Sequence, residues 1–226
     1  MKDIIFDIDS AQCSRIANDI FIKDSGIDRP GRKFEKMREA AYQIRSLIGS
    51  DVKLRFACRY YDEINLTGKT LVIGGQSFVC NAFEQIESGA VEGVYAYAVC
   101  AGEFDMPDKK IMDQLYADIW GTAFADAVRF VVRQRLEEEA ALSESFGPGF
   151  YGMDVSEISN LDKLLDFSRI GIELRNDTIM VPLKSCAGMF FKVNENYIPL
   201  NTACETCRGS HKSCRLCHVN GGSQYV

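Results

Sequence analysis

The sequence predicts an α+β fold, in which a mixed, mainly antiparallel sheet carries packed helices. Three observations support this prediction. A long stripe of apolar residues at helical spacing runs through residues 111–136. Shorter segments, of which 91–100 is the most apolar, have the composition of strands. Because helices and strands do not alternate in the regular order that builds a parallel sheet, a mainly antiparallel sheet is expected.

Length and composition indicate one main globular domain with a small appendage. The chain has 226 residues, of which 46% are hydrophobic and 26% charged, which is enough to bury a core within a single domain. Apolar periodicity stops near residue 201, where a cysteine-rich stretch begins. We therefore expect a domain over residues 1–200 and a separate tail over residues 201–226.

Charge and hydropathy exclude two classes of partner. The longest uncharged apolar run, residues 94–102, is far too short to cross a bilayer, and residues 1–10 lack the basic and apolar regions of a signal peptide. A net charge of −6 argues against general nucleic-acid binding, which needs a clustered basic face. We expect a soluble, cytoplasmic protein that binds neither nucleic acid nor membrane.

In the first third of the chain, one helix and two strands precede a capping signal. Residues 30–49 place apolar side chains at helical spacing, with a proline at the start and a glycine at the end. Residues 53–64 alternate between apolar and charged, which predicts a strand, and residues 70–73 predict a second short one. Ser77 then suits the N-cap of a helix over residues 78–89.

The second half contains the long helix of residues 111–136, within which Gly121 marks a bend. Residues 143–152 are rich in glycine, proline and aromatic residues and predict a loop. Ser156 suits the N-cap of a short helix that follows the loop. Two strands complete the body, at residues 178–182 and 187–193.

The sharpest local motif lies in the tail, where Cys204 and Cys207 are separated by six residues from Cys214 and Cys217. Four thiolates in two such pairs fit zinc or a four-iron cluster, and both histidines of the protein lie in the same stretch. The gap is shorter than the roughly 15–20 residues of a zinc ribbon, which favours an iron–sulfur cluster or an irregular zinc site. Free thiols or two disulfides are the alternative.

The body lacks the residues of nucleophilic hydrolysis. No histidine lies outside the tail, so a Ser-His-Asp or Cys-His mechanism is excluded there. The five body cysteines lie among apolar neighbours and are expected to be small buried side chains. The Gly74-Gly75 segment lacks the rest of a phosphate-binding fingerprint and predicts a connecting turn.

One loop has the composition of a ligand-binding segment. It contains, in order, Gly147, Pro148, Gly149, Phe150 and Tyr151, with another glycine following. Glycines let the backbone approach a ligand closely, and two aromatic rings can flank a flat group such as adenine. A tight turn whose aromatic rings pack into the core explains the same composition.

Residues 148–191 resemble the activation domain of cobalamin-dependent methionine synthase. The shared elements are a Pro-Gly-aromatic loop, a short helix, an Ile-Gly-Val-like strand and a Pro-x-x-Ser-x-x-Gly segment, found here at residues 148–150, 161–167, 170–172 and 182–188. The stretch from residue 83 through residue 99 to the long helix resembles the family more weakly. The resemblance covers most of the chain, but not the tail.

This resemblance implies a domain that binds S-adenosylmethionine and caps a corrinoid held by another protein, for reductive methylation of cob(II)alamin. Its partners would be a corrinoid-binding methyltransferase or methionine synthase modules, with flavodoxin or another electron donor. Because the chain has no recognisable methyltransferase or corrinoid-binding module, it would act as a stand-alone protein. The implied S-adenosylmethionine site comprises Ser145, Gly147, Pro148, Gly149, Phe150, Tyr151, Lys184 and Ser185.

Three positions depart from the family pattern. Ser145 stands where the family has an arginine that holds the ligand carboxylate, and Phe150 stands for a tyrosine, with Tyr151 adjacent. A helical glutamate of the family falls at Thr122, with Asp126 one turn further on. A lost charge-assisted contact costs about 1.5–3 kcal/mol. The alternative function is therefore a non-catalytic module that docks or senses a corrinoid protein and carries a structural metal site.

Overall fold

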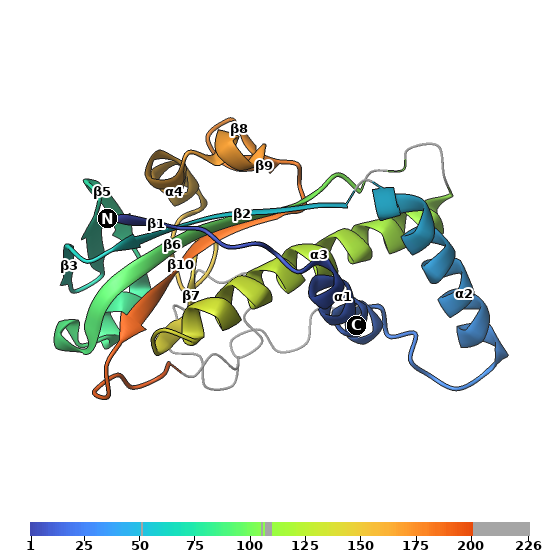
Figure 1. The fold of residues 1–226 in the computed structure, drawn as a ribbon, viewed down its shortest axis with the longest axis horizontal. Helices are drawn as coiled ribbons and strands as arrows, with labels where there is room; N and C mark the ends of the chain where they lie inside the picture. Colours follow the sequence, from blue (N-terminus) through green and yellow to red (C-terminus); the bar gives the residue numbers. More distant parts are fainter. Residues whose placement is uncertain (51, 105, 107–109, 201–226) are drawn as a thin grey trace.

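The computed structural model describes residues 1–50, 52–104, 106 and 110–200. Its centre is an antiparallel sheet with one layer of elements on each face (Figure 1). The five strands of this sheet are, in spatial order, β1 (Lys2–Ile4), β2 (Val52–Tyr61), β6 (Val91–Gly102), β10 (Ser185–Val193) and β7 (Leu142–Phe146). Every neighbouring pair is antiparallel, which confirms the predicted α+β class.

The central strand β6 separates two cores. Tyr95, Tyr97 and Val99 pack on the side of the long helix, whereas the residues between them pack on the other side. This follows from the period of two along a strand, which sends successive side chains to opposite faces. Almost every residue of β6 is buried, as its apolar composition predicts.

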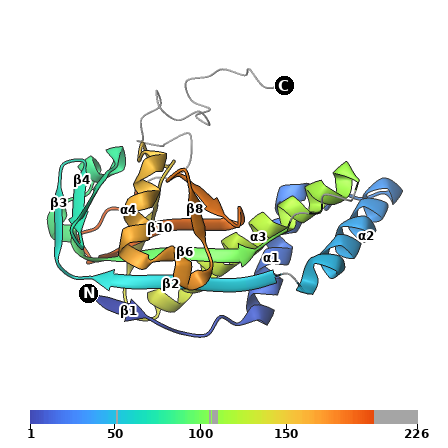
Figure 2. The same cartoon turned by 90° about the horizontal axis from the view of Figure 1, so that it is seen from above.

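One face of the sheet carries α3 (Ile111–Glu137), with α1 (Ser10–Ser25) and α2 (Arg32–Leu47) packed on it. Figure 2 shows α3 running past the end of the sheet, where α2 lies against it. Trp120 of α3 is 1% exposed, stacks on Phe21 at 3.9 Å between ring centroids and donates to the Ala41 carbonyl at 3.0 Å. The indole thus joins all three helices.

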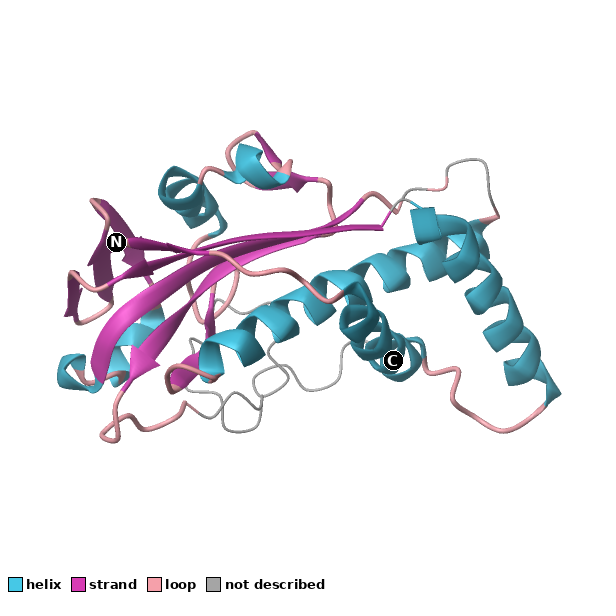
Figure 3. Cartoon of the chain, viewed as in Figure 1, coloured by secondary structure: helices cyan, strands magenta, loops and turns pink. Residues whose placement is uncertain are grey.

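The opposite face carries α4 (Ile158–Leu165) and the β8–β9 hairpin (Figure 3). Strands β8 (Glu173–Arg175) and β9 (Ile179–Val181) follow α4 in the chain. A second small sheet consists of β3 (Ile64–Thr67), β4 (Thr70–Ile73) and β5 (Gln76–Val79). Short 3-10 turns connect these elements, at Ile48–Ser50, Asn81–Gln85, Ser88–Ala90, Val155–Glu157 and Phe167–Ile170.

The helix predicted over residues 78–89 is wrong. Gln76–Val79 is strand β5, and Asn81–Gln85 is a 3-10 turn. Gly74 and Gly75 have φ of 52° and 74°, and Ile73 pairs with Gln76, so the glycines form a two-residue hairpin loop. Such loops favour positive φ at both central residues, which glycine adopts without steric cost. The predicted connecting turn at these glycines is confirmed.

Three further details differ from the sequence prediction. The segment 143–152 is a loop only after Phe146, because its first residues belong to edge strand β7. The cap of the turn before α4 is Asp154, whose carboxylate accepts the Ser156 amide at 2.8 Å. Helix α1 was not predicted, although Asp9 caps it in the ordinary way by accepting two backbone amides.

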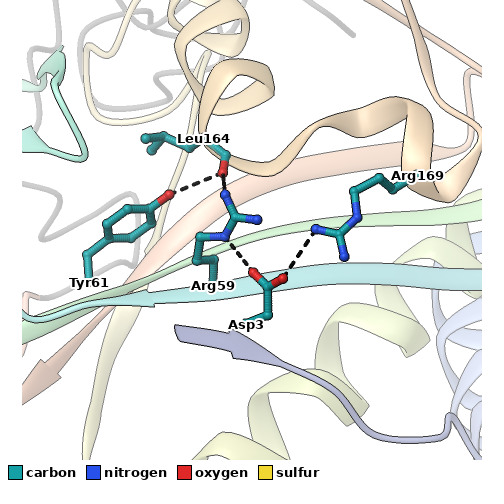
Figure 4. Close-up of polar contacts among 5 residues, drawn as sticks. All are labelled: Asp3, Arg59, Tyr61, Leu164 and Arg169. Carbon is teal, nitrogen blue, oxygen red and sulfur yellow. Dashed lines mark hydrogen bonds and ion pairs between the residues drawn. The ribbon is translucent and has the colours of Figure 1, made fainter. Parts of the chain in front are cut away.

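A small polar network fastens β1 to the sheet and to the end of α4 (Figure 4). Arg59 donates to Asp3 at 2.5 Å and to the Leu164 carbonyl, which also accepts the Tyr61 hydroxyl at 3.1 Å. Arg169 reaches the other carboxylate oxygen of Asp3 at 3.4 Å. The hydrogen bond from Arg59 lowers the pKa of Asp3, so this carboxylate stays charged in the folded protein.

Two expectations about side chains and hydropathy can be checked in the body. Cys13, Cys58, Cys80 and Cys100 are buried and Cys186 is half-buried, all as free thiols, so the prediction of small apolar packing is largely confirmed. Among the helices of the described residues, none is long and apolar enough to span a membrane.

Candidate functional site

Pairing of β7 with β10 brings the start of the predicted ligand loop against Ala187 and Gly188, at the end of the second predicted segment. Ser145 lies opposite Phe190, and beyond β7 the chain runs on against β10. A Cβ on Gly147 would lie 2.9 Å from the Ala187 carbonyl oxygen, and one on Gly188 would lie 2.6 Å from the Phe146 carbonyl oxygen. Two segments that lie forty residues apart therefore meet through backbone contact that only glycine permits.

Lys184 lies on the α3 side of the sheet. Its ammonium donates to Asp118 at 2.6 Å and to the Thr122 hydroxyl at 3.1 Å. The lysine stem crosses α3 at Gly121, where an added Cβ would lie 2.6 Å from the Lys184 Cγ and 2.8 Å from the Phe104 ring. Gly121 thus makes room for these side chains, which is a different reason for glycine than the predicted bend.

Ser185 points to the other face of the sheet. Its cross-strand partner is Cys100, which belongs to the core on the α4 side, whereas Cys186 and its partner Val99 belong to the core on the α3 side. The Ser185 hydroxyl is buried and has no hydrogen-bond partner among the described residues. The structure therefore separates Ser185 from Lys184, although the sequence resemblance placed both in one site.

Ser145 forms a hydroxyl pair with Tyr97. The two oxygens lie 2.6 Å apart, and the Tyr97 ring stacks on Phe190 at 4.7 Å between centroids. Burial is the main cause that raises the pKa of Tyr97, so its phenol stays neutral and remains available as a hydrogen-bond donor. The pair lies on the α3 face, directly where the predicted ligand loop begins.

Arg129 is a residue of this region that the sequence resemblance did not indicate. It lies on α3 and pairs with Asp126 at 2.9 Å. Burial raises the pKa of Cys186 to about 12, and the neighbouring Arg129 guanidinium opposes that rise. Arg129 has the same lowering effect on the pKa of Tyr97. An arginine three residues after an aspartate, on a helix that is otherwise largely apolar, was the available sequence signal.

We call the polar side chains between α3 and the sheet the polar strip. It extends along the α3 face from Lys184 to the start of the ligand loop. Its members are Tyr97, Asp118, Thr122, Asp126, Arg129, Ser145 and Lys184. The strip combines two carboxylates, two cations and three hydroxyl groups.

The two loop aromatics have different environments. Tyr151 packs against Phe146 at 5.5 Å between ring centroids, and its carbonyl accepts the Asn81 amide at 3.0 Å. Phe150 is 64% exposed, and Gly149 beside it has a φ of 88°. One ring thus packs against the core, as a tight turn would require, while the other is exposed, and binding of a flat ligand by this loop stays a prediction.

The predicted metal ligands Cys204, Cys207, Cys214 and Cys217 lie outside the described residues. Among the residues that are described, no group of three or more His, Cys, Asp or Glu side chains is arranged to hold a metal ion. The tail metal site and the boundary between the domain and the tail stay predictions.

An antiparallel sheet with α3 on one face and α4 on the other makes this an α+β domain. One solved structure with a similar fold is the MetH reactivation domain bound to AdoHcy, S-adenosylhomocysteine, with a TM-score of 0.61 and 12% identity over 86% of this chain and 78% of that chain. No family model matches the chain, and no curated protein matches it in sequence. The comparison confirms the fold predicted from residues 148–191.

Proposed function

We propose that this protein binds S-adenosylmethionine beside the polar strip and acts as a stand-alone activator of a corrinoid methyltransferase such as methionine synthase. The observation that carries the proposal is the register of β7 and β10. It joins the Pro-Gly-aromatic loop to the Pro-x-x-Ser-x-x-Gly segment within the fold of a domain whose solved structure holds AdoHcy.

The residues at this junction fit the chemistry of S-adenosylmethionine. Gly147 and Gly149 allow close backbone approach, and the exposed ring of Phe150 suits contact with a flat adenine. Asp118 and Asp126 provide negative charge for a ligand with a positive sulfonium. Lys184 and Arg129 balance that charge, so the strip matches a ligand that carries both signs.

The corrinoid would be held by a partner protein, and it would supply the methyl acceptor for reductive methylation, with flavodoxin or another donor providing the electron. The present chain binds and orients the methyl donor, because holding two reactants in place lowers the entropic part of the barrier. Phe150 and Leu183 are 64% and 75% exposed and provide apolar surface for capping a flat macrocycle.

Calorimetric titration of S-adenosylmethionine and S-adenosylhomocysteine into the purified full chain is the direct test. Saturable binding, followed by faster remethylation of an oxidised corrinoid protein when the chain is added, is the expected result. Equal remethylation rates with and without the chain would contradict the proposed activity.

A second function has its own support in the sequence. Ser145 and Thr122 replace charged residues of the family, which favours a module that docks or senses a corrinoid protein without binding S-adenosylmethionine. This function predicts no calorimetric signal with either nucleoside but stable association with a corrinoid protein, measured by co-sedimentation.

Under either proposed function, the cysteine-rich tail would add a metal site. Its four cysteines would bind zinc in a structural role, or an iron–sulfur cluster that delivers the electron for reduction. Metal analysis of anaerobically purified protein distinguishes them, because a cluster gives iron, sulfide and a visible absorption band that bleaches with dithionite. Loss of the bound metal in a variant with all four cysteines replaced by serine is expected in either case.

A further inference from the structure

The Asp126–Arg129 pair is the charged part of the polar strip closest to the start of the ligand loop. The guanidinium and the carboxylate are 2.9 Å apart, one helical turn from each other on α3. The two side chains are 40% and 37% exposed, so a ligand can reach both of them. Both residues are half-buried, and a pair this accessible to solvent contributes only about 0–1 kcal/mol to stability.

The groups that face Arg129 from the sheet are uncharged, while Arg133, one turn further along α3, is already paired with Glu137 and donates to the Ser143 carbonyl. Tyr97 and Ser145 form their hydroxyl pair nearby, and burial keeps the phenol of Tyr97 and the thiol of Cys186 protonated by raising their pKa. Asp126 on the same helix supplies the single negative charge that is hydrogen-bonded to Arg129. One cation, one carboxylate and two hydroxyls are thus gathered beside the ligand loop.

The amino-acid end of an S-adenosyl ligand presents a carboxylate and an ammonium group. We propose that Arg129 binds this carboxylate and that Asp126 binds the ammonium, an inference that rests on the proposed function. When the ligand arrives, one internal ion pair is exchanged for two ligand ion pairs, so no charge is left without a partner. Arginine suits the role because its planar guanidinium matches a carboxylate in bidentate fashion.

The other cation of the strip is placed less well for this role. Lys184 is committed to Asp118 and Thr122, and its side chain is only 17% exposed. Along β10 it precedes the residue opposite Ser145 by six positions, which at about 3.3 Å per residue is roughly 20 Å. Arg129 is therefore the better partner for the ligand carboxylate, and Lys184 lies at the other end of the polar strip.

The test uses two ligands and two matched variants of the full chain. S-adenosylhomocysteine has the amino-acid end, whereas 5′-methylthioadenosine lacks it. Arg129→Gln is expected to weaken binding of S-adenosylhomocysteine about tenfold to a hundredfold and to leave methylthioadenosine binding unchanged. Arg135→Gln is the control, since Arg135 forms a similar three-residue ion pair with Glu138 on the same helix, and it should change neither affinity.

Arg129→Lys and Asp126→Asn complete the set. The lysine keeps the charge but not the planar fork, so it should recover part of the affinity that Arg129→Gln loses. Asp126→Asn should also weaken binding of S-adenosylhomocysteine and leave binding of methylthioadenosine unchanged. Melting temperatures measured without ligand confirm that each variant is folded.

Each other outcome overturns the assignment in a recognisable way. If Arg129→Gln binds S-adenosylhomocysteine as tightly as the unchanged protein, the inference fails while the proposed function stands. If Arg129→Gln lowers the affinity for both ligands to the same degree, Arg129 only supports the structure of the site. If the unchanged protein binds neither ligand, the inference and the proposed function fail together.

Discussion

The two faces of the central sheet differ in what they bury. On the α4 face, Phe83, Phe146 and Phe191 form an aromatic cluster with ring centroids 5.0 to 5.4 Å apart. On the α3 face, the same strands present Tyr97 and Ser145, whose polar atoms meet a line of charged helical residues. The contrast teaches that the strand pleat itself separates aromatic packing from polar contacts, because neighbours in sequence such as Ser145 and Phe146 face opposite sides of the sheet.

Phe146→Ala is expected to have the largest effect. The ring is fully buried among other aromatic rings, and truncating such a residue costs about 3–5 kcal/mol in the free energy of unfolding. Urea unfolding followed by circular dichroism measures this loss. A change below about 1 kcal/mol would show that the α4 face is not the closed core described here.

Gly188→Ala tests the backbone junction between the faces. The new Cβ would lie 2.6 Å from the Phe146 carbonyl oxygen and 3.1 Å from the Tyr97 hydroxyl, so β7 must shift. We expect a loss of about 1–3 kcal/mol, as for other overpacked positions. The matched control is Gly89→Ala, where nothing lies within 4 Å of the added Cβ and stability should hold. Similar losses in both variants would contradict the close approach.

The sequence was informative where a pattern is long and local. Helix α3 was predicted from a helical periodicity over many residues, and strand β6 from a long, nearly continuous apolar run. Strand β5 was missed because its four residues are too few to separate a strand from a helix, and only the Gly-Gly loop before it carried the signal. Strand β1 was missed because its partner β2 lies more than fifty residues away.

In the candidate site, too, residues in local motifs could be predicted, and residues that depend on tertiary packing could not. The loop of Gly147 to Tyr151 and the segment around Lys184 could be found because each is a short motif. Their contact depends on the β7–β10 register, which no local pattern encodes. Tyr97 was missed because it reaches Ser145 across the sheet, and Arg129 was missed because it reaches Tyr97 only through the packing of α3 on the sheet.

Ser145→Ala tests whether the hydroxyl pair on the α3 face is structural. Removing the serine hydroxyl leaves the buried Tyr97 hydroxyl without this partner, which should cost about 1–3 kcal/mol. The double variant Ser145→Ala with Tyr97→Phe removes both polar groups and should lose less than the sum of the two single changes. Strict additivity in urea unfolding would show that the two hydroxyls do not interact.

The smallest effect is expected at the sheet edge, where Asp3 joins β1 to Arg59. Because the hydrogen bond from Arg59 lowers the folded-state pKa of Asp3, its contribution is present above the ordinary value of 3.8 and is lost as pH falls through the lowered pKa. Asp3 is 38% exposed, so Asp3→Asn should cost no more than about 1 kcal/mol at neutral pH. The difference between the two proteins should shrink on acidification, measured as melting temperature from pH 7 down to about pH 3. Asp19→Asn, which removes an exposed carboxylate of α1, serves as the control. A difference that persists unchanged in acid would show that Asp3 acts through packing and not through its charge.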